Sequence, residues 1–189
     1  MKIVVLDGFT LNPGDLSWDE LKEIGNVTVY ERTPVDKIFE RIGDAEIVFT
    51  NKTPLGGDDF KKLPNLKYIG VLATGYNVVD TEAAKDFGIT VTNVPTYGTM
   101  AVAQFTFALL LEMCHHVWEH NMAVKNGEWT KCADFCFYKY PLVELTGKTL
   151  GVIGYGRIGK AVSNIAQVFG MKVLAYSRSK DAVIDSENV

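Results

Sequence analysis

The chain has 189 residues, of which 47% are hydrophobic, 11% aromatic and 22% charged. This composition is typical of a globular protein with a core, and it excludes a disordered chain and a collagen-like fibre. The formal net charge is −4, from 19 basic and 23 acidic residues, so no basic surface is expected to collect nucleic acid or anionic lipid. We therefore expect neither a nucleic acid nor a membrane as a partner.

The cysteines and the apolar stretches bear on location and metal binding. The three cysteines, Cys114, Cys132 and Cys136, are an odd number without metal-ligand spacing. They favour reduced thiols in the cytoplasm and predict no metal site. The chain enters an apolar strand directly after Lys2, and residues 100–111 fall well short of the ~20 apolar residues that span a bilayer. We expect neither an export signal nor a membrane span.

The first half of the chain alternates short apolar runs with helix-length segments, which indicates βαβ units and a parallel sheet. The predicted strands are residues 2–6, 27–30, 46–50, 68–72 and 89–92, and the predicted helices are residues 18–24, 35–42, 58–63 and 80–87. We expect residues 1–98 to form one α/β domain.

A long helix is predicted next, because residues 99–125 contain no glycine or proline and are apolar nearly all round in their first half. We expect one continuous helix, buried on most faces, followed by an aromatic-rich loop over residues 126–141. A strand, a helix and a strand are then predicted at residues 148–154, 157–169 and 171–176. Since a dinucleotide-binding sheet needs more strands than these two, residues 99–189 are expected to hold only part of a second domain.

Three glycines lie between the strand and the helix of that last unit. Gly154, Gly156 and Gly159 form a G-x-G-x-x-G motif, in which they serve the tight turn, the approach of backbone to a pyrophosphate, and close helix–strand packing. A glycine-rich structural turn is the alternative. The order of strand, glycines, helix and strand favours a dinucleotide-binding turn, with the pyrophosphate at the helix N-terminus.

The tip of the second strand bears on the choice of cofactor. An NAD site usually has an acidic residue there for the ribose 2′-hydroxyl. This chain has Ser177, Arg178 and Ser179, and Arg178 is suited to bind a 2′-phosphate through two hydrogen bonds. The motif therefore favours NADP, or comparable use of NADP and NAD. A solvated basic loop is the alternative.

Several motifs together resemble the D-isomer-specific 2-hydroxyacid dehydrogenase family, and within it the glycerate dehydrogenase/hydroxypyruvate reductase branch. The segments that carry the resemblance are residues 73–80, 88–95, 101–104, 126–129 and 145–159. The resemblance implies a flavodoxin-like parallel-sheet substrate domain followed by the first part of a Rossmann domain. It also implies reversible hydride transfer between NAD(P) and a small 2-oxo/2-hydroxy acid.

The resemblance further implies roles for individual residues. The backbone amides of Ala73, Thr74 and Gly75 would bind the substrate carboxylate. Cofactor contacts are implied for the glycine motif with its intervening residues and for two threonines: Gly154, Gly156, Arg157, Ile158, Gly159, Thr74 and Thr106. From its neighbouring loop, Lys52 could meet the same carboxylate, with a merely solvated lysine as the alternative. Gln104 departs from the glutamate that the family usually has at that position.

The family's acid–base histidine, its carboxylate partner and its substrate-binding arginine are expected beyond this chain. We assign no catalytic role to His115, His116 or His120, and expect the 189 residues alone to be inactive. The apolar helix predicts a homodimer built on residues 99–141. Within that stretch an aromatic cluster either packs against a partner subunit or roofs a substrate, and packing is favoured; its members are Phe135, Phe137, Tyr138 and Tyr140. A truncated, non-catalytic binding or oligomerising module is the alternative to an enzyme.

Overall fold

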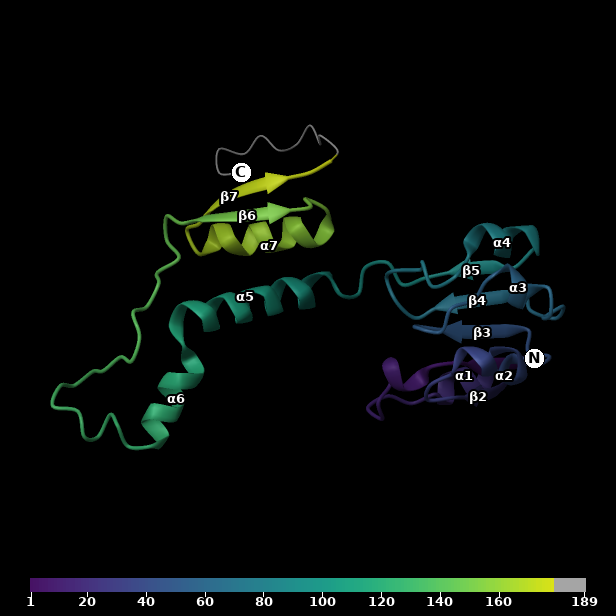
Figure 1. Cartoon of the computed structure of the whole chain (residues 1–189), viewed down its shortest axis with the longest axis horizontal. Helices are drawn as coiled ribbons and strands as arrows, with labels where there is room; N and C mark the ends of the chain where they lie inside the picture. The colour runs from purple at the N-terminus through teal and green to yellow at the C-terminus, as the bar shows by residue number, and fades with distance from the viewer. Residues whose placement is uncertain (179–189) are drawn as a thin grey trace. The chain divides into compact units, whose positions relative to one another are not determined.

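The computed structural model describes residues 1–178 and divides the chain into two compact units (Figure 1). The first unit is Met1–Tyr97, and the second begins at Gly98. Ser179, predicted to contact a cofactor, lies outside the described residues.

The first unit contains a sheet of five strands in the order β2-β1-β3-β4-β5, and all of its neighbours are parallel. The strands are β1 (Lys2–Val5), β2 (Asn26–Val29), β3 (Ile47–Thr50), β4 (Tyr68–Val71) and β5 (Thr90–Thr92). The connections carry α1 (Asp19–Ile24), α2 (Ile38–Ile42), α3 (Gly57–Phe60) and α4 (Thr81–Asp86), with 3₁₀ turns η1 (Gly8–Thr10) and η2 (Val35–Lys37). This strand order is that of flavodoxin-like folds, so the predicted fold class is confirmed.

The two faces of this sheet are covered to different extents: helices bury one face, while α1, which has no buried residue, only partly covers the other. One face packs against α2, α3 and α4 in a core that includes Val4, Leu6, Ile38, Val48, Phe60, Ile69, Val71 and Ala84. On the other face Trp18 and Leu21, at α1, line a hollow of about 290 Å³ together with Phe49 and Leu72. The carboxyl ends of the strands are thereby left for loops, which are the usual place for a ligand in such a fold.

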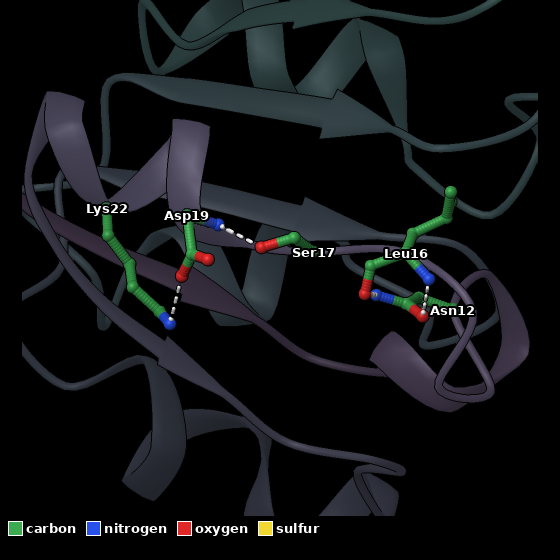
Figure 2. A network of polar contacts seen from close by, with 5 residues as sticks. All are labelled: Asn12, Leu16, Ser17, Asp19 and Lys22. Atoms are coloured by element: carbon green, nitrogen blue, oxygen red, sulfur yellow. Dashed lines mark hydrogen bonds and ion pairs between the residues drawn. The ribbon is translucent and has the colours of Figure 1, made fainter.

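The loop before α1 is held by local hydrogen bonds, shown in Figure 2. The Oδ1 of Asn12 accepts the Leu16 amide at 3.0 Å, and its Nδ2 donates to the Leu16 carbonyl at 2.8 Å. The Ser17 hydroxyl accepts the Asp19 amide at 3.0 Å just before the helix, whose N-cap residue, Trp18, makes no side-chain cap bond. Lys22 bonds the Asp19 carboxylate at 2.8 Å, which is the largest cause of a lowered Asp19 pKa.

The second unit holds one βαβ arrangement packed on a helix. It consists of α5 (Thr99–His115), α6 (Val117–Lys125), β6 (Thr149–Ile153), α7 (Arg157–Val168) and β7 (Lys172–Tyr176). Strands β6 and β7 pair in parallel, and α7 lies between them and α5 (Figure 1). The shared core includes Ala103, Phe107, Val162, Ala166 and Val173. The predicted strand–helix–strand unit is present.

The prediction of one continuous helix over residues 99–125 is wrong. His116 has left-handed backbone angles (φ 48°, ψ 50°) and separates α5 from α6, which are bent by 59°. The backbone carbonyl of Glu112 accepts a hydrogen bond from the His116 amide at 2.8 Å. The Glu112 carboxylate accepts one from the Trp118 amide at 3.2 Å. These bonds satisfy backbone groups at the break, so a helix end forms without glycine or proline. No single described helix is long and apolar enough to cross a membrane, and α5 and α6 reach such a length only as this bent pair.

The expectation that this helix is buried on most faces is also wrong. Only Ala103, Phe107 and Cys114 of α5 are buried. Large apolar side chains elsewhere on α5 are 53–76% exposed, namely Met100, Phe105, Leu109 and Met113. Helix α7 covers one side of α5, and in the described part of the second unit the other side stays open to solvent.

Candidate cofactor and acid sites

The glycine motif forms a tight turn between β6 and α7. Gly154 has φ +100°, a conformation that side chains disfavour, and its amide donates to the Tyr176 carbonyl at 2.8 Å. This bond joins the carboxyl end of β6 to that of β7. The turn therefore sits at the edge of the sheet where dinucleotides bind in Rossmann folds.

Gly159 lies where α7 packs against this turn. A Cβ added there would be 2.2 Å from the Gly154 carbonyl oxygen, so no larger residue fits without moving the helix. The buried Ser163 hydroxyl donates to the Gly159 carbonyl at 2.8 Å and fixes the first turns of α7. The third glycine of the motif thus serves the close packing that the sequence predicted.

Gly156 faces open space at the start of α7. A Cβ added there would meet no atom within 4 Å, and no side chain caps the helix at this residue. The first amides of α7, starting at Arg157 and Ile158, therefore lie at an uncapped N-terminus with its partial positive charge. This open, positive end of a 12-residue helix fits a pyrophosphate.

A hollow of about 370 Å³ adjoins the turn and is lined by residues 153–156 and 176–178. None of these described lining residues is acidic, and the exposed Arg178 is the only cation among them. Tyr155 and Tyr176, to which the sequence assigned no role, also line it. Their positions could have indicated a place at the site, since Tyr155 lies inside the glycine motif and Tyr176 is the last residue of β7. The lining fits the phosphate and ribose part of a dinucleotide, with Arg178 among the lining residues.

Thr106 lies elsewhere. Its hydroxyl donates to the Val102 carbonyl, one turn earlier in α5, at 2.8 Å. It is not among the residues that line the hollow at the glycine turn. Its contact with a cofactor stays a prediction.

In the first unit, the turn after β4 is tied to the segment after β5. The Ala73 carbonyl accepts the Val94 amide at 3.1 Å, and the Thr74 carbonyl accepts the Asn93 side chain at 2.8 Å. The Thr74 hydroxyl donates to the Val94 carbonyl at 3.2 Å. Within residues 1–178 no group accepts a hydrogen bond from the amides of residues 73–75. The turn is therefore anchored through its carbonyls, and its amides can bind an anion.

Lys52 belongs to the neighbouring turn, after β3. The Thr50 carbonyl accepts the Leu72 amide at 2.8 Å, so the turns after β3 and β4 start side by side at the carboxyl edge of the sheet. The Lys52 side chain is exposed, while the buried Asp7 accepts its backbone amide. The sequence assigned no role to Asp7, although it directly follows the predicted first strand, residues 2–6. A carboxylate directly after a buried strand was the signal for a further role.

The histidines and cysteines form no second site. In the described residues no group of three or more His, Cys, Asp or Glu side chains could hold a metal ion. Cys114, Cys132 and Cys136 are free thiols. His120 uses both ring nitrogens within the protein, with Nδ1 on the His116 carbonyl at 2.8 Å and Nε2 accepting the Lys139 amide at 3.1 Å.

The aromatic residues of the loop are divided between packing and exposure. Phe137 lies against His120 and Trp129, with ring centroids 6.2 and 5.9 Å apart. Tyr140 tilts over His116 at 4.7 Å. Phe135 and Tyr138 are exposed, and Tyr140 is still 44% exposed despite its contact with His116. These contacts within the chain do not test packing against a partner subunit, which stays a prediction.

Comparisons with known proteins agree with this geometry. Residues 3–184 match the family model described as D-isomer specific 2-hydroxyacid dehydrogenase, catalytic domain. A hydroxypyruvate reductase of Blautia hydrogenotrophica is 56% identical over the whole chain, and a glycerate dehydrogenase of Methylorubrum extorquens is 38% identical. The chain spans only 59% and 60% of the length of these two relatives.

Solved structures show the same fold. An acyclic imino acid reductase in complex with NADPH and D-Arg has a TM-score of 0.76 and 30% identity, over 97% of this chain and 58% of that one. The D-lactate dehydrogenase of Escherichia coli has a TM-score of 0.73 and 26% identity, over 96% of this chain and 57% of that one.

Proposed function

Because this chain belongs to the D-isomer specific 2-hydroxyacid dehydrogenase family, we propose that it forms part of an NAD(P)-dependent oxidoreductase. The reaction is the reversible reduction of a small 2-oxo acid, of the hydroxypyruvate or glyoxylate type, to its 2-hydroxy acid. The membership confirms the resemblance carried by the sequence motifs. The observation that carries the proposal is the glycine turn, in which Gly156 leaves open space at the uncapped N-terminus of α7.

Residues 99–189 form the cofactor part in this proposal. A bound nicotinamide cofactor supplies or accepts the hydride. The amides at the start of α7 hold its pyrophosphate, which Gly156 admits because it has no side chain. Arg178 meets a 2′-phosphate beside Ser177, and the absence of an acidic residue in the described lining supports NADPH use at least equal to that of NADH.

Residues 1–98 form the substrate part. The amides of Ala73, Thr74 and Gly75 bind the carboxylate of the acid, and Lys52 adds a positive charge beside them. Carboxylate binding orients the 2-oxo group for hydride transfer. The support is the set of unused amides in a turn that is anchored through its carbonyls.

Proton transfer needs an acid–base group within hydrogen-bond reach of the reacting oxygen. His120 is engaged at both nitrogens, and we assign no proton transfer to His115 or His116. We place the acid–base histidine, its carboxylate partner and the substrate-binding arginine in the portion of the relatives that this chain does not span.

We further propose a homodimer built on α5 and the loop to residue 141. The exposed apolar side of α5 supports it, because a contiguous apolar surface of this kind is typical of an interface. A cytoplasmic location is proposed from the three free thiols.

The proposal is tested by titrating the 189-residue chain with NADPH and NADH and following nicotinamide fluorescence. Saturable binding of either cofactor supports the oxidoreductase. An absence of binding by a folded chain favours the alternative, a non-catalytic binding or oligomerising module. Replacement of Gly159 by alanine distinguishes binding at the glycine turn from binding elsewhere.

A further inference from the structure

The carboxylate of Asp7 fixes the turn that carries Lys52. Asp7 is only 3% exposed, and it accepts the amides of three consecutive residues. Its Oδ1 lies 2.8 Å from the Asn51 nitrogen, while its Oδ2 accepts the Lys52 amide and, at 2.8 Å, the Thr53 amide. The Thr53 hydroxyl approaches the same oxygen at 3.3 Å. A buried carboxylate without such partners would be strongly unfavourable, so these bonds lock the turn.

A second set of hydrogen bonds involves the same two segments, the loop after β1 and the turn after β3. The Asn51 side chain donates to the Thr10 hydroxyl at 2.8 Å, and that hydroxyl donates to the Asp7 carbonyl at 2.8 Å. The buried Thr50 hydroxyl donates to the Thr53 carbonyl at 2.7 Å. The turn after β3 is thus held by bonds within itself and to Asp7 and Thr10, while Lys52 stays exposed.

Three consecutive amides that converge on one point form a concavity suited to an anion. Here the protein's own carboxylate occupies that concavity. A substrate carboxylate therefore cannot use the amides of residues 51–53, whereas the amides of residues 73–75, after the neighbouring strand, have no acceptor in the described chain. Asp7 thus determines which of two adjacent turns can bind an anion.

We propose that Asp7 is a positioning residue for the acid site. It occupies the amides of the turn after β3, holds Lys52 beside the turn after β4, and leaves the amides of residues 73–75 as the donors to the carboxylate. This inference rests on the proposed function, since it names a residue that prepares the proposed substrate site.

The test uses oxamate, whose carboxylate and adjacent carbonyl match those of a 2-oxo acid, and the full 189-residue chain. Backbone amide signals of residues 73–75 are followed by NMR as oxamate is added to wild type, Asp7→Asn, Lys52→Ala and the double variant. We expect Asp7→Asn to weaken binding roughly tenfold, because the turn that carries Lys52 loosens. In the Lys52→Ala background the same change should have little further effect.

The matched control is Asp80→Asn. Asp80 accepts the Ala83 amide at 3.0 Å and caps α4, so its loss should lower stability without changing oxamate affinity. If Asp7→Asn does not fold, Asp7→Glu takes its place in the titration, because it keeps the carboxylate but moves it. In wild type, hydrogen exchange should be slow at Asn51, Lys52 and Thr53.

The outcomes separate the two proposals. Oxamate binding that is unchanged by Asp7→Asn, or weakened equally with and without Lys52, overturns the positioning role alone. Fast exchange at residues 51–53 does the same. If folded wild type shows no oxamate response at residues 73–75, the proposed acid site fails, and the positioning role fails with it.

Discussion

Arg178 lies exposed at the tip of β7, on the rim of the hollow beside the glycine turn. Its replacement by alanine should weaken NADPH binding by roughly 1–3 kcal/mol, because a charge-assisted contact with the 2′-phosphate is lost. NADH binding should change little. Fluorescence titration with both cofactors measures this, and Lys172→Ala, an exposed cation of the same strand outside the hollow, is the control. A wild-type chain that binds NADH much more tightly than NADPH would contradict the proposed contact between Arg178 and the 2′-phosphate.

Gly159 offers a second test at this scale. In Gly159→Ala the new Cβ would lie 2.2 Å from the Gly154 carbonyl oxygen, so α7 must shift away from the turn. We expect a loss of stability of about 1–3 kcal/mol, as for other overpacked sites, and at least a tenfold loss of cofactor affinity. Denaturant unfolding and cofactor titration measure the two effects. Gly151→Ala is the matched control, since a Cβ there meets nothing within 4 Å.

At the scale of elements, the exposed side of α5 predicts association. Phe105→Glu should weaken self-association at least tenfold, because a charge would replace a 64% exposed aromatic side chain in the proposed interface. Sedimentation equilibrium of wild type and variant measures it. Val35→Glu, at an apolar position of the first unit that is 70% exposed, should leave association unchanged. A well-folded wild-type monomer at micromolar concentration would remove the dimer from the proposal.

At the scale of the whole molecule, a polypeptide of these 189 residues should show no turnover on glyoxylate, hydroxypyruvate or pyruvate with NADH or NADPH. The chemical reason is that no histidine in it is assigned to proton transfer. In addition, β6 and β7 are covered by α7 on one face, while Ile153 and Leu174 are exposed on the other. Absorbance at the nicotinamide band, with chain length verified by mass, measures turnover. If this polypeptide oxidises NADPH with glyoxylate at an ordinary enzymatic rate, our assignment of the catalytic residues is wrong.

The open face of the two-stranded sheet also bears on behaviour in solution. An uncovered face of parallel strands with exposed apolar residues favours association with other chains. We therefore expect weak cofactor binding and concentration-dependent light scattering from the same polypeptide. Tight cofactor binding by a sample that shows no concentration-dependent light scattering would contradict this expectation.

The alternation of strands and helices, the parallel sheet and the glycine turn could all be predicted from the sequence. Each depends on residues that are close together in the chain: apolar runs of one strand, or Gly154 and Gly159 five positions apart. Their predicted ends are close to the observed ones. The difference is larger in the short helix α3, predicted over residues 58–63 and observed as Gly57–Phe60, because sequence patterns define helix ends poorly.

Only the tertiary structure decided the features that join distant parts of the chain. Asp7 meets Thr53 across 46 positions, and no local pattern marks that pair. The break at His116 is a different case: its bonds are local, from Glu112 to His116 and Trp118, but they lie in a stretch whose composition predicts a continuous helix. The exposed side of α5 likewise follows from where α7 packs. Hydrophobic periodicity and turn chemistry are local, whereas burial and the partners of buried polar groups are set by the packing of the folded chain.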